Sequence, residues 1–358
     1  MPPSLTHFRA VVLTSLVVAT IAFAGLAQYV PRTRTPAPAA APSSGVSEST
    51  DTIRADVAPR AVLARGTRAA RQCVVNSDVL PSVCVVTALV GTYEKTLKQV
   101  EVQEGAFAGG YMFAFTDRAD LLERHNAIVD GVLAPARWHA LPLHVPTDAG
   151  DCRDGERNSP CTNRHPFNLA KFYKMQFFRV PLIAERCDVV AWCDATLHIK
   201  APFFAALTRF ALEDKNLVVY VHARRGNVAA EVRESSYAKY SGASWNGHVQ
   251  PVQPVDEQFA AYTAEGFTSK WFDANGAVYT PQYGLYVTCM VMFDLRKNVT
   301  YEFLDAWWQQ NLQWTTQDQV SFPYVAWKLN VFPYALPDHA HGGTSDNNAL
   351  FRKLRHGV

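Results

Sequence analysis

Short apolar runs, each ending in a polar or turn-forming residue, recur along this chain. In the run DVVAWCD at residues 188–194, both faces of the predicted strand are largely apolar, which is typical of a parallel strand covered by helices on two sides. Similar runs predict strands at residues 83–90, 111–115, 217–221 and 285–295, and helical spacing predicts helices at 166–179 and 301–311. The pattern therefore predicts an α/β domain with a mainly parallel central sheet.

Polar residues follow three of these strands at the point where each strand ends. They are Asp117, Asp194 and the pair His222 and Arg225. Because open α/β sheets bind ligands outside the carboxyl ends of their strands, all four are candidate ligand residues. Each also has a structural alternative. Asp194 could form a turn, Asp117 could cap the next helix, and the segment from His222 to Arg225 could be an exposed loop.

Basic residues recur along the predicted helix at 166–179. Arg164, Lys171 and Lys174 are spaced by seven and three residues, so they fall on one flank. A basic stripe of this kind could meet phosphates, but it is also typical of a solvated helix face.

A second helix start is predicted near residue 316. Thr316 and Gln319 fit a capping box, and Asp318 lies near the positive end of the helix dipole. Helix capping and the helix dipole alone could therefore explain Asp318 and Gln319, without a functional role.

The N-terminal part of the chain has a different composition. Residues 11–30 carry no charge over a length that can cross a bilayer core as a helix, so we predict a transmembrane signal anchor after a short tail at 1–10. A cleaved signal peptide is the alternative. Residues 31–72, rich in Pro, Ala, Ser and Thr, predict a flexible stem. A folded domain at 73–345 and a C-terminal tail at 346–358 follow.

Composition and missing motifs exclude several classes of protein. The 34 Lys and Arg residues against 32 Asp and Glu residues leave a net charge of +2, which argues against nucleic acid as the main partner. The sequence contains no P-loop, no GxGxxG, no HExxH and no complete GxSxG motif. Phosphate-loop enzymes, dinucleotide oxidoreductases, zincins and α/β-hydrolases therefore lose support.

The seven cysteines contain no CxxC pair, so disulfides are a better interpretation than a structural zinc site. Cys152 and Cys161 flank one polar loop, and Cys73 and Cys84 flank another, which makes both pairs candidate bridges. An odd number leaves at least one free thiol, which we expect to be Cys289 inside an apolar strand.

Six segments, taken together and in their order along the chain, indicate a protein family more specifically than any one of them does. They are VVTALVGTY at 85–93, YMFAFTD at 111–117, FYKMQFF at 172–178, DVVAWCDAT at 188–196, VVYVHARR at 218–225 and QDQVSFPYVAWKL at 317–329. Together they resemble a glycosyltransferase-like domain family named after plant turgor-regulation and seed-mucilage proteins. The resemblance implies a GT-A-like nucleotide-sugar-binding domain in a type II membrane protein. It also implies a hexosyltransferase-type enzyme that uses a UDP-sugar or similar donor and a glycan, protein or lipid acceptor.

The resemblance also implies roles for individual residues. Asp194 stands in the family's Trp-x-Asp segment, Asp117 in its Phe-Thr-Asp segment, His222 and Arg225 in its His-x-x-Arg segment, and Asp318 and Gln319 form its Asp-Gln pair. We therefore expect catalytic roles for Asp194, Asp318 and Gln319. Donor-binding roles are expected for Thr87, Asp117, Lys174, His222 and Arg225. The sequence departs from the family at Gln317, where arginine is usual, and at Val287, where glutamate is expected.

A GT-A transferase must neutralise a departing nucleoside diphosphate, commonly with Mn²⁺ or Mg²⁺. The Trp-Cys-Asp segment supplies only one carboxylate, that of Asp194, and a thiol is a poor ligand for a hard metal. Asp194 is therefore the candidate metal ligand, with Asp318 or His339 as a second one. Alternatively, the basic residues Lys174 and Arg225 replace the metal.

Two other functions fit the same residues. A ceramidase-like amide hydrolase would use a metal-bound water near Asp194 and His222, and a non-catalytic glycan-binding domain would keep the fold alone. The resemblance and the predicted anchor imply a Golgi or ER membrane protein with a lumenal domain. The glycosylation sequon at Asn298 is usable only there.

Overall fold

The computed structural model of the chain describes residues 80–355, apart from residues 102–109, 126–127, 130–131, 134–136, 144–156, 223, 226, 243, 246–247, 250, 269–283 and 338–339. The predicted anchor at 11–30 and the predicted stem at 31–72 lie outside the described residues. Among the helices of the described part of the chain, none has the length and apolar character needed to cross a membrane.

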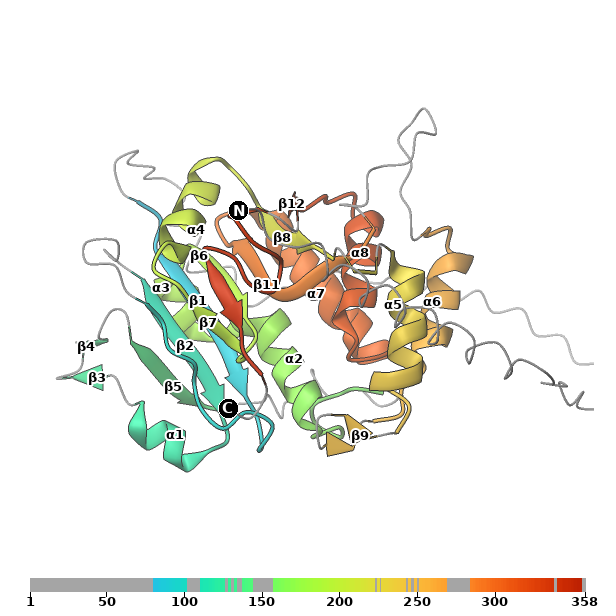
Figure 1. Cartoon of the computed structure of the whole chain (residues 1–358), viewed down its shortest axis with the longest axis horizontal. Coiled ribbons are helices and arrows are strands. Elements are labelled where there is room, and N and C mark those ends of the chain that lie inside the picture. The colour runs from blue at the N-terminus through green and yellow to red at the C-terminus, as the bar shows by residue number, and fades with distance from the viewer. Residues whose placement is uncertain are drawn as a thin grey trace, which may run out of the picture. The chain divides into compact units, whose positions relative to one another are not determined.

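A seven-stranded sheet forms the centre of the domain (Figure 1), with the spatial order β12-β8-β11-β6-β1-β2-β5. β11 is antiparallel to both of its neighbours, and every other adjacent pair is parallel. The prediction of a mainly parallel sheet is confirmed. In chain order the strands are β1 (Val83–Leu89), β2 (Tyr111–Thr116), β5 (Trp138–Pro142), β6 (Val189–Cys193), β8 (Leu217–Val221), β11 (Tyr286–Asp294) and β12 (Tyr334–Leu336).

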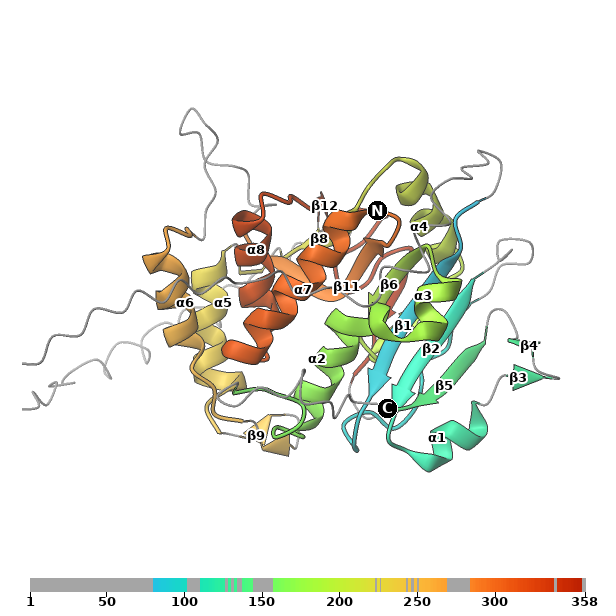
Figure 2. The same ribbon diagram turned by 180° about the vertical axis from the view of Figure 1, so that it is seen from behind.

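Two hydrophobic cores lie on the two faces of this sheet. In β6, Val190 and Trp192 point into the first core, and Val189, Ala191 and Cys193 point into the second. The first core is covered by α2 (Pro166–Gln176), α3 (Pro181–Arg186), α7 (Asn298–Gln313) and α8 (Asp318–Lys328), which Figure 2 brings in front of the sheet. The second core is covered by α4 (Phe203–Leu212) and by β7 (Leu197–Ile199) with β13 (Phe351–Lys353). Both faces of β6 are therefore covered, as its two-sided apolar pattern predicted.

The remaining described elements lie around these layers. Beside α8, α5 (Val228–Glu234) continues into a π-helical turn, η2 (Ser235–Lys239), and α6 (Val255–Ala264) packs next to both. The other short elements are α1 (Ala119–Arg124), the 3-10 turn η1 (Phe177–Arg179), and the hairpins β3 (Ile128–Val129) with β4 (Val132–Leu133) and β9 (Ser244–Trp245) with β10 (His248–Val249).

The C-terminal segment differs from the predicted tail at 346–358. β13 pairs antiparallel with β7, and Phe351 is fully buried in the second core. The described residues of this segment therefore belong to the domain. A three-residue strand with one apolar residue is too short for a hydrophobic pattern to reveal.

The disulfide pairing also differs from the sequence prediction. Cys84 in β1 is bonded to Cys187, so the candidate bridge between Cys73 and Cys84 is wrong. Because β1 and β6 are neighbours in the sheet, the chain entering β6 passes the start of β1 and brings the two sulfurs together. Cys161 is also disulfide-bonded, whereas Cys152 lies outside the described residues. The expected free thiol of Cys289 is confirmed, and Cys193 is a second one.

Candidate functional site

The strand order changes direction beside β1. From β1 the chain passes outwards to β2 and β5, and then returns to place β6 on the other side of β1. At such a switch point the connections after the two strands diverge, which leaves space for a ligand outside their carboxyl ends. Asp194 directly follows β6 and therefore lies at the edge where a ligand is expected.

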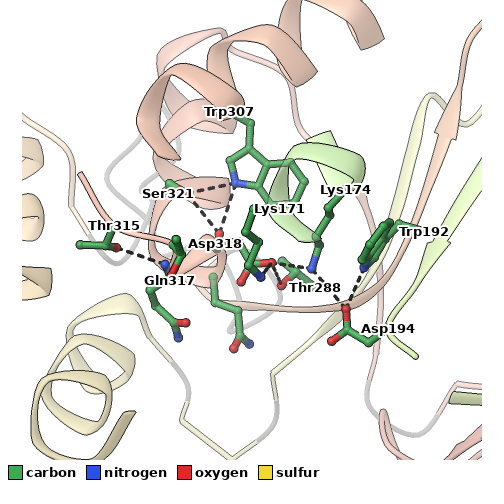
Figure 3. A network of polar contacts seen from close by, with 12 residues as sticks. Lys171, Lys174, Trp192, Asp194, Thr288, Trp307, Thr315, Gln317, Asp318 and Ser321 are labelled. Carbon is green, nitrogen blue, oxygen red and sulfur yellow. Dashed lines mark hydrogen bonds and ion pairs between the residues drawn. The ribbon is translucent and has the colours of Figure 1, made fainter. Parts of the chain in front are cut away.

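Five polar residues from four elements meet at this edge, and we call them the edge cluster (Figure 3). They are Lys171 and Lys174 of α2, Asp194 after β6, Thr288 of β11 and Asp318 at the start of α8.

Asp318 lies at the centre of the edge cluster. Its Oδ2 is 2.8 Å from the Nζ atom of Lys171, forms a second ion pair with Lys174, and accepts a hydrogen bond of 3.0 Å from Thr288. The carboxylate is only 4% exposed. A buried carboxylate is stable only when paired and hydrogen-bonded, and Asp318 meets this requirement in full.

Asp194 forms the accessible side of the same cluster. Its Oδ1 accepts a hydrogen bond of 2.7 Å from the indole nitrogen of Trp192 and lies 3.7 Å from the Nζ atom of Lys174. The side chain is 42% exposed, whereas Lys174 is 1% exposed. One oxygen of Asp194 is thus held by the protein, and the carboxylate remains open to a ligand.

The two lysines come from successive turns of α2. Lys171 is 16% exposed, and the ammonium of Lys174 lies 5.7 Å and 5.8 Å from the ring centroids of Trp192 and Trp307, within the range of a cation–π contact. The solvated-face interpretation of the basic stripe is therefore wrong for both lysines. It holds for Arg164, which is exposed before the helix begins.

The direction of β11 explains why Thr288 reaches this edge. Since β11 runs antiparallel to β6 and β8, its amino end lies beside their carboxyl ends. The pairing with β8 shifts register between Val287 and Val291. A register irregularity of this kind redirects side chains and is common next to functional sites.

The start of α8 does not use the predicted capping box. Gln317 is the N-cap residue and makes no side-chain cap, while the hydroxyl of Thr316 contacts Gln253 and Tyr240 instead. The amide nitrogen of Gln319 donates to the backbone oxygen of Tyr286 at 2.9 Å. Tertiary partners have replaced the local caps, and they tie the first turn of α8 to the amino end of β11.

Gln317 is fully buried in a second polar network behind Asp318. Its amide nitrogen donates to Glu231 and, at 3.0 Å, to Ser235. Its amide oxygen accepts from Lys239 at 2.9 Å and from Tyr240 at 3.3 Å. This network places Lys239, the last residue of the π-helical turn, close to Asp318.

The electrostatics of the cluster follow from burial and charge. Burial would raise the pKa of the Asp318 carboxyl, but Lys171, Lys174 and Lys239 outweigh it and hold this pKa well below its usual range. Burial lowers the pKa of Lys171 to about 8, against the attraction of Asp318. For Lys174 the effect of burial is outweighed by Asp318 and Asp194, which raise its pKa.

Asp117 joins the ends of β1 and β2. Both of its carboxylate oxygens accept from the backbone nitrogen of Gly91, at 2.9 Å and 3.1 Å. The N-cap of α1 is Arg118, so the helix-capping alternative for Asp117 is wrong. Gly91 has a φ of +67°, a left-handed conformation that favours glycine.

His222 and Arg225 lie beyond the carboxyl end of β8. Arg225 forms ion pairs with Glu231 and Glu234, and its backbone nitrogen donates to Nδ1 of His222 at 3.3 Å. Burial lowers the pKa of His222. Within the described part of the chain neither residue contacts the edge cluster directly, and Glu231 and Gln317 connect Arg225 to the first turn of α8.

Thr87 lies within β1, two residues before its end, and is 1% exposed. Its hydroxyl has no hydrogen-bond partner among the described residues. By strand alternation it shares a face with Val85, which belongs to the second core, so it points away from Lys174.

The described residues do not fit a protein site for Mn²⁺ or Mg²⁺. Hard cations need several oxygen ligands, but Oδ2 of the buried Asp318 carboxylate already contacts two lysines and Thr288, and Lys174 lies beside Asp194, so ammonium groups stand where a cation would bind. Cys193 points to the opposite face, and burial raises its pKa. No group of three His, Cys, Asp or Glu side chains that could hold a metal occurs in the described part of the chain. His339 lies outside it.

Sequence reasoning missed Thr288, Trp307 and Lys239, and it named Lys171 only as part of the basic stripe. The spacing of the basic stripe was the one signal for Lys171, and nothing in the residues near Lys239 or Thr288 indicates where their side chains point.

Comparisons with known proteins give structural likenesses only. No family model matches the sequence, and no curated protein matches it, so the family resemblance stays a prediction. The crystal structure of mouse xyloside xylosyltransferase 1 in its apo form aligns with a TM-score of 0.39 and 9% identity, over 72% of this chain and 85% of that chain. The apo structure of the WbbM bifunctional glycosyltransferase aligns with a TM-score of 0.37 and 11% identity, over 70% of this chain and 38% of that one. The functional assignment below rests on the edge cluster and not on these likenesses.

Proposed function

We propose that this chain is a glycosyltransferase that moves a sugar from a nucleotide-sugar donor, of the UDP-sugar type, to a hydroxyl of a glycan, protein or lipid acceptor. The donor binds at the sheet edge between the carboxyl ends of β1 and β6. The observation that carries the proposal is the edge cluster, in which an accessible carboxylate, Asp194, lies 3.7 Å from the buried ammonium group of Lys174 at the switch point of an α/β sheet.

The two kinds of charge match the two halves of such a donor. Sugar hydroxyl groups donate hydrogen bonds to carboxylates, and the free oxygen of Asp194 is available for this contact. A diphosphate needs positive charge, which Lys171 and Lys174 supply at the same edge. A site with fixed charges of both signs can therefore orient the sugar and its leaving group together.

The reaction exchanges one bond at the anomeric carbon of the sugar for another. The bond from this carbon to the diphosphate oxygen breaks, and its electron pair stays on the departing nucleoside diphosphate. The acceptor hydroxyl oxygen forms the new bond, and its proton passes to a released phosphate oxygen or to water. Positive charge near the diphosphate oxygen lowers the barrier because negative charge develops there in the transition state.

A ligand screen tests this proposal. The full-length chain is titrated with a panel of nucleotide sugars, with and without Mn²⁺, and thermal unfolding is followed. A donor present at about 100 times its dissociation constant should stabilise the fold by about 2.7 kcal/mol. Release of nucleoside diphosphate in the presence of acceptor should accompany binding. No stabilisation by any donor, together with cleavage of a lipid amide, would favour the hydrolase instead.

We also propose a type II arrangement in the Golgi or ER membrane, with residues 11–30 as the anchor and the domain in the lumen. The Cys84–Cys187 disulfide supports this, because disulfides persist in oxidising compartments. Asn298 of the sequon is exposed. Protease treatment of intact microsomes should leave the domain protected, and digestion of the domain there would reverse the orientation.

A further inference from the structure

Among the described residues, the edge cluster and the side chains that interact with it contain more positive than negative charge. Lys171, Lys174 and Lys239 contribute three ammonium groups, while Asp318 and Asp194 contribute two carboxylates. Glu231 does not change this count, because Arg225 pairs with it. An excess of positive charge in a largely buried site is unfavourable unless an anion binds there.

The three lysines differ in what they can touch. Lys174 is 1% exposed and held between Asp318, Trp192 and Trp307, so it acts as a fixed charge inside the protein. Lys171 is 16% exposed, and Lys239 is partly exposed and donates, among the described residues, to a neutral acceptor, the Gln317 amide oxygen. Lys171 and Lys239 can therefore donate to a ligand.

Lys171 and Lys239 also lie within electrostatic range of each other. The charge of Lys239 lowers the pKa of Lys171, and both interact with Asp318 and Asp194. Both ammonium groups reach the start of α8: the Nζ atom of Lys239, from η2, donates to Gln317 at 2.9 Å, and that of Lys171, from α2, lies 2.8 Å from the next residue, Asp318.

We propose that Lys171 and Lys239 bind the diphosphate of the donor directly, with Lys174 as a fixed charge behind them, and that this chain therefore binds its donor without a divalent ion. The inference rests on the proposed function. It assigns to lysines the charge neutralisation that a metal commonly provides, and it agrees with the poor fit of the described residues to a metal site. Arg225, the other basic candidate, is already held by Glu231 and Glu234.

Inorganic pyrophosphate is the probe for this subsite. Calorimetric titration of the full-length chain in EDTA should show binding, and added Mn²⁺ should not be required. Lys171→Gln should weaken binding by about tenfold, the effect of losing one charge-assisted hydrogen bond. Lys239→Gln should act in the same direction, and Lys171→Arg should keep most of the affinity.

Lys328→Gln is the matched control, since it removes one positive charge from the opposite end of α8, about 15 Å away. It should leave the pyrophosphate affinity within about twofold of wild type. Thermal unfolding of each variant separates lost binding from lost folding, and the wild-type titration in EDTA tests the inference even if a variant does not fold.

Failure of this inference and failure of the proposed function give different results. Donor turnover that strictly needs Mn²⁺, without pyrophosphate binding in EDTA, overturns the lysine subsite and leaves the glycosyltransferase in place. Pyrophosphate binding through Lys171 in EDTA, without turnover of any nucleotide sugar, supports the subsite and removes the proposed reaction. Equal weakening by Lys171→Gln and Lys328→Gln would show a nonspecific charge effect and overturn the subsite.

Discussion

Lys174 of α2 and Asp318 of α8 form an ion pair in which the lysine is 1% exposed and the aspartate 4% exposed. An exposed pair of this kind contributes little to stability. In a buried pair each charge depends on the other, because removing one leaves its partner buried without compensation. The first turn of α8 therefore stabilises the buried charge of Lys174 on α2.

Asp318→Asn should destabilise the fold strongly. Lys174 would lose its closest counter-charge, and the loss of one member of a buried pair typically reduces the free energy of unfolding by about 3–5 kcal/mol. Urea unfolding measures the change. Asp305→Asn on α7 is the control, because Asp305 is half exposed in its pair with Arg179 and should change stability by less than about 0.5 kcal/mol. Similar losses for both variants would contradict the buried-pair argument.

The same pair predicts a loss of stability in acid. The pKa of Asp318 is held well below its ordinary value of 3.8 in the folded chain, so below pH 3.8 the unfolded chain binds more protons than the folded one. The contribution of Asp318 is complete above that value and is lost as the pH falls towards the folded pKa. Between about pH 5 and pH 3, the free energy of unfolding should fall more steeply for wild type than for Asp318→Asn. Equal slopes would assign the acid sensitivity to other carboxylates.

Asp194→Asn should abolish sugar transfer while the fold remains intact. Asparagine keeps the shape and can still accept from Trp192, and Lys174 retains Asp318, but the charge that faces the ligand is lost. We expect kcat to fall by about 10²-fold or more, as when a charged group that acts on the transition state is removed. Melting temperature and turnover are measured together. Near-normal turnover would leave Asp194 as a turn residue only.

Gln317→Arg should destabilise this chain, although the resembled family usually has arginine there. The Gln317 amide oxygen accepts from Lys239, and a guanidinium in its place would face that ammonium with no acceptor. A loss of about 1–3 kcal/mol is expected from the unsatisfied buried donor. Adding Lys239→Gln should recover part of the loss. A double-mutant cycle measures the coupling, and purely additive effects would point to steric crowding instead.

The Cys84–Cys187 bridge should make an independent contribution to stability. It closes a loop with a sequence separation of 103 residues, and removing a native disulfide from a domain typically costs about 2–5 kcal/mol. A reductant should lower the melting temperature of wild type by more than that of the double variant Cys84→Ala, Cys187→Ala, which still contains the disulfide of Cys161. A reductant effect of equal size on the double variant would assign it to another bridge.

The sheet and its ligand edge could be predicted from the sequence because each strand is a short run of consecutive apolar residues that can be recognised without knowing its neighbours in space. The run at 217–221 forms β8 over the same residues, and Asp194 follows β6 as the two-sided apolar pattern predicted. The antiparallel direction of β11 could not be predicted, since an apolar run has the same composition in either direction.

The charge pairing of the site could not be predicted from the sequence either. Lys171 and Lys174 form a flank that helical periodicity identifies, but periodicity does not say whether that flank faces water or another element. Their partner Asp318 is on a helix far along the chain, where local capping offered a sufficient explanation. Only the packing of α2 against α7, and of α7 against α8, brings them together.

Because the chain is synthesised from its N-terminal end, α8 is one of the last elements to be made. Residues emerge from the ribosome N-terminal first, so α2 and β6 are available before Asp318 exists. Until then the half-exposed Asp194 is the one carboxylate partner of Lys174 among the described residues, and burying its ammonium is unfavourable. We therefore expect the burial of Lys174 to be completed only after residue 318 has emerged, and α2 to be more accessible to chaperones and proteases in nascent chains that stop before it.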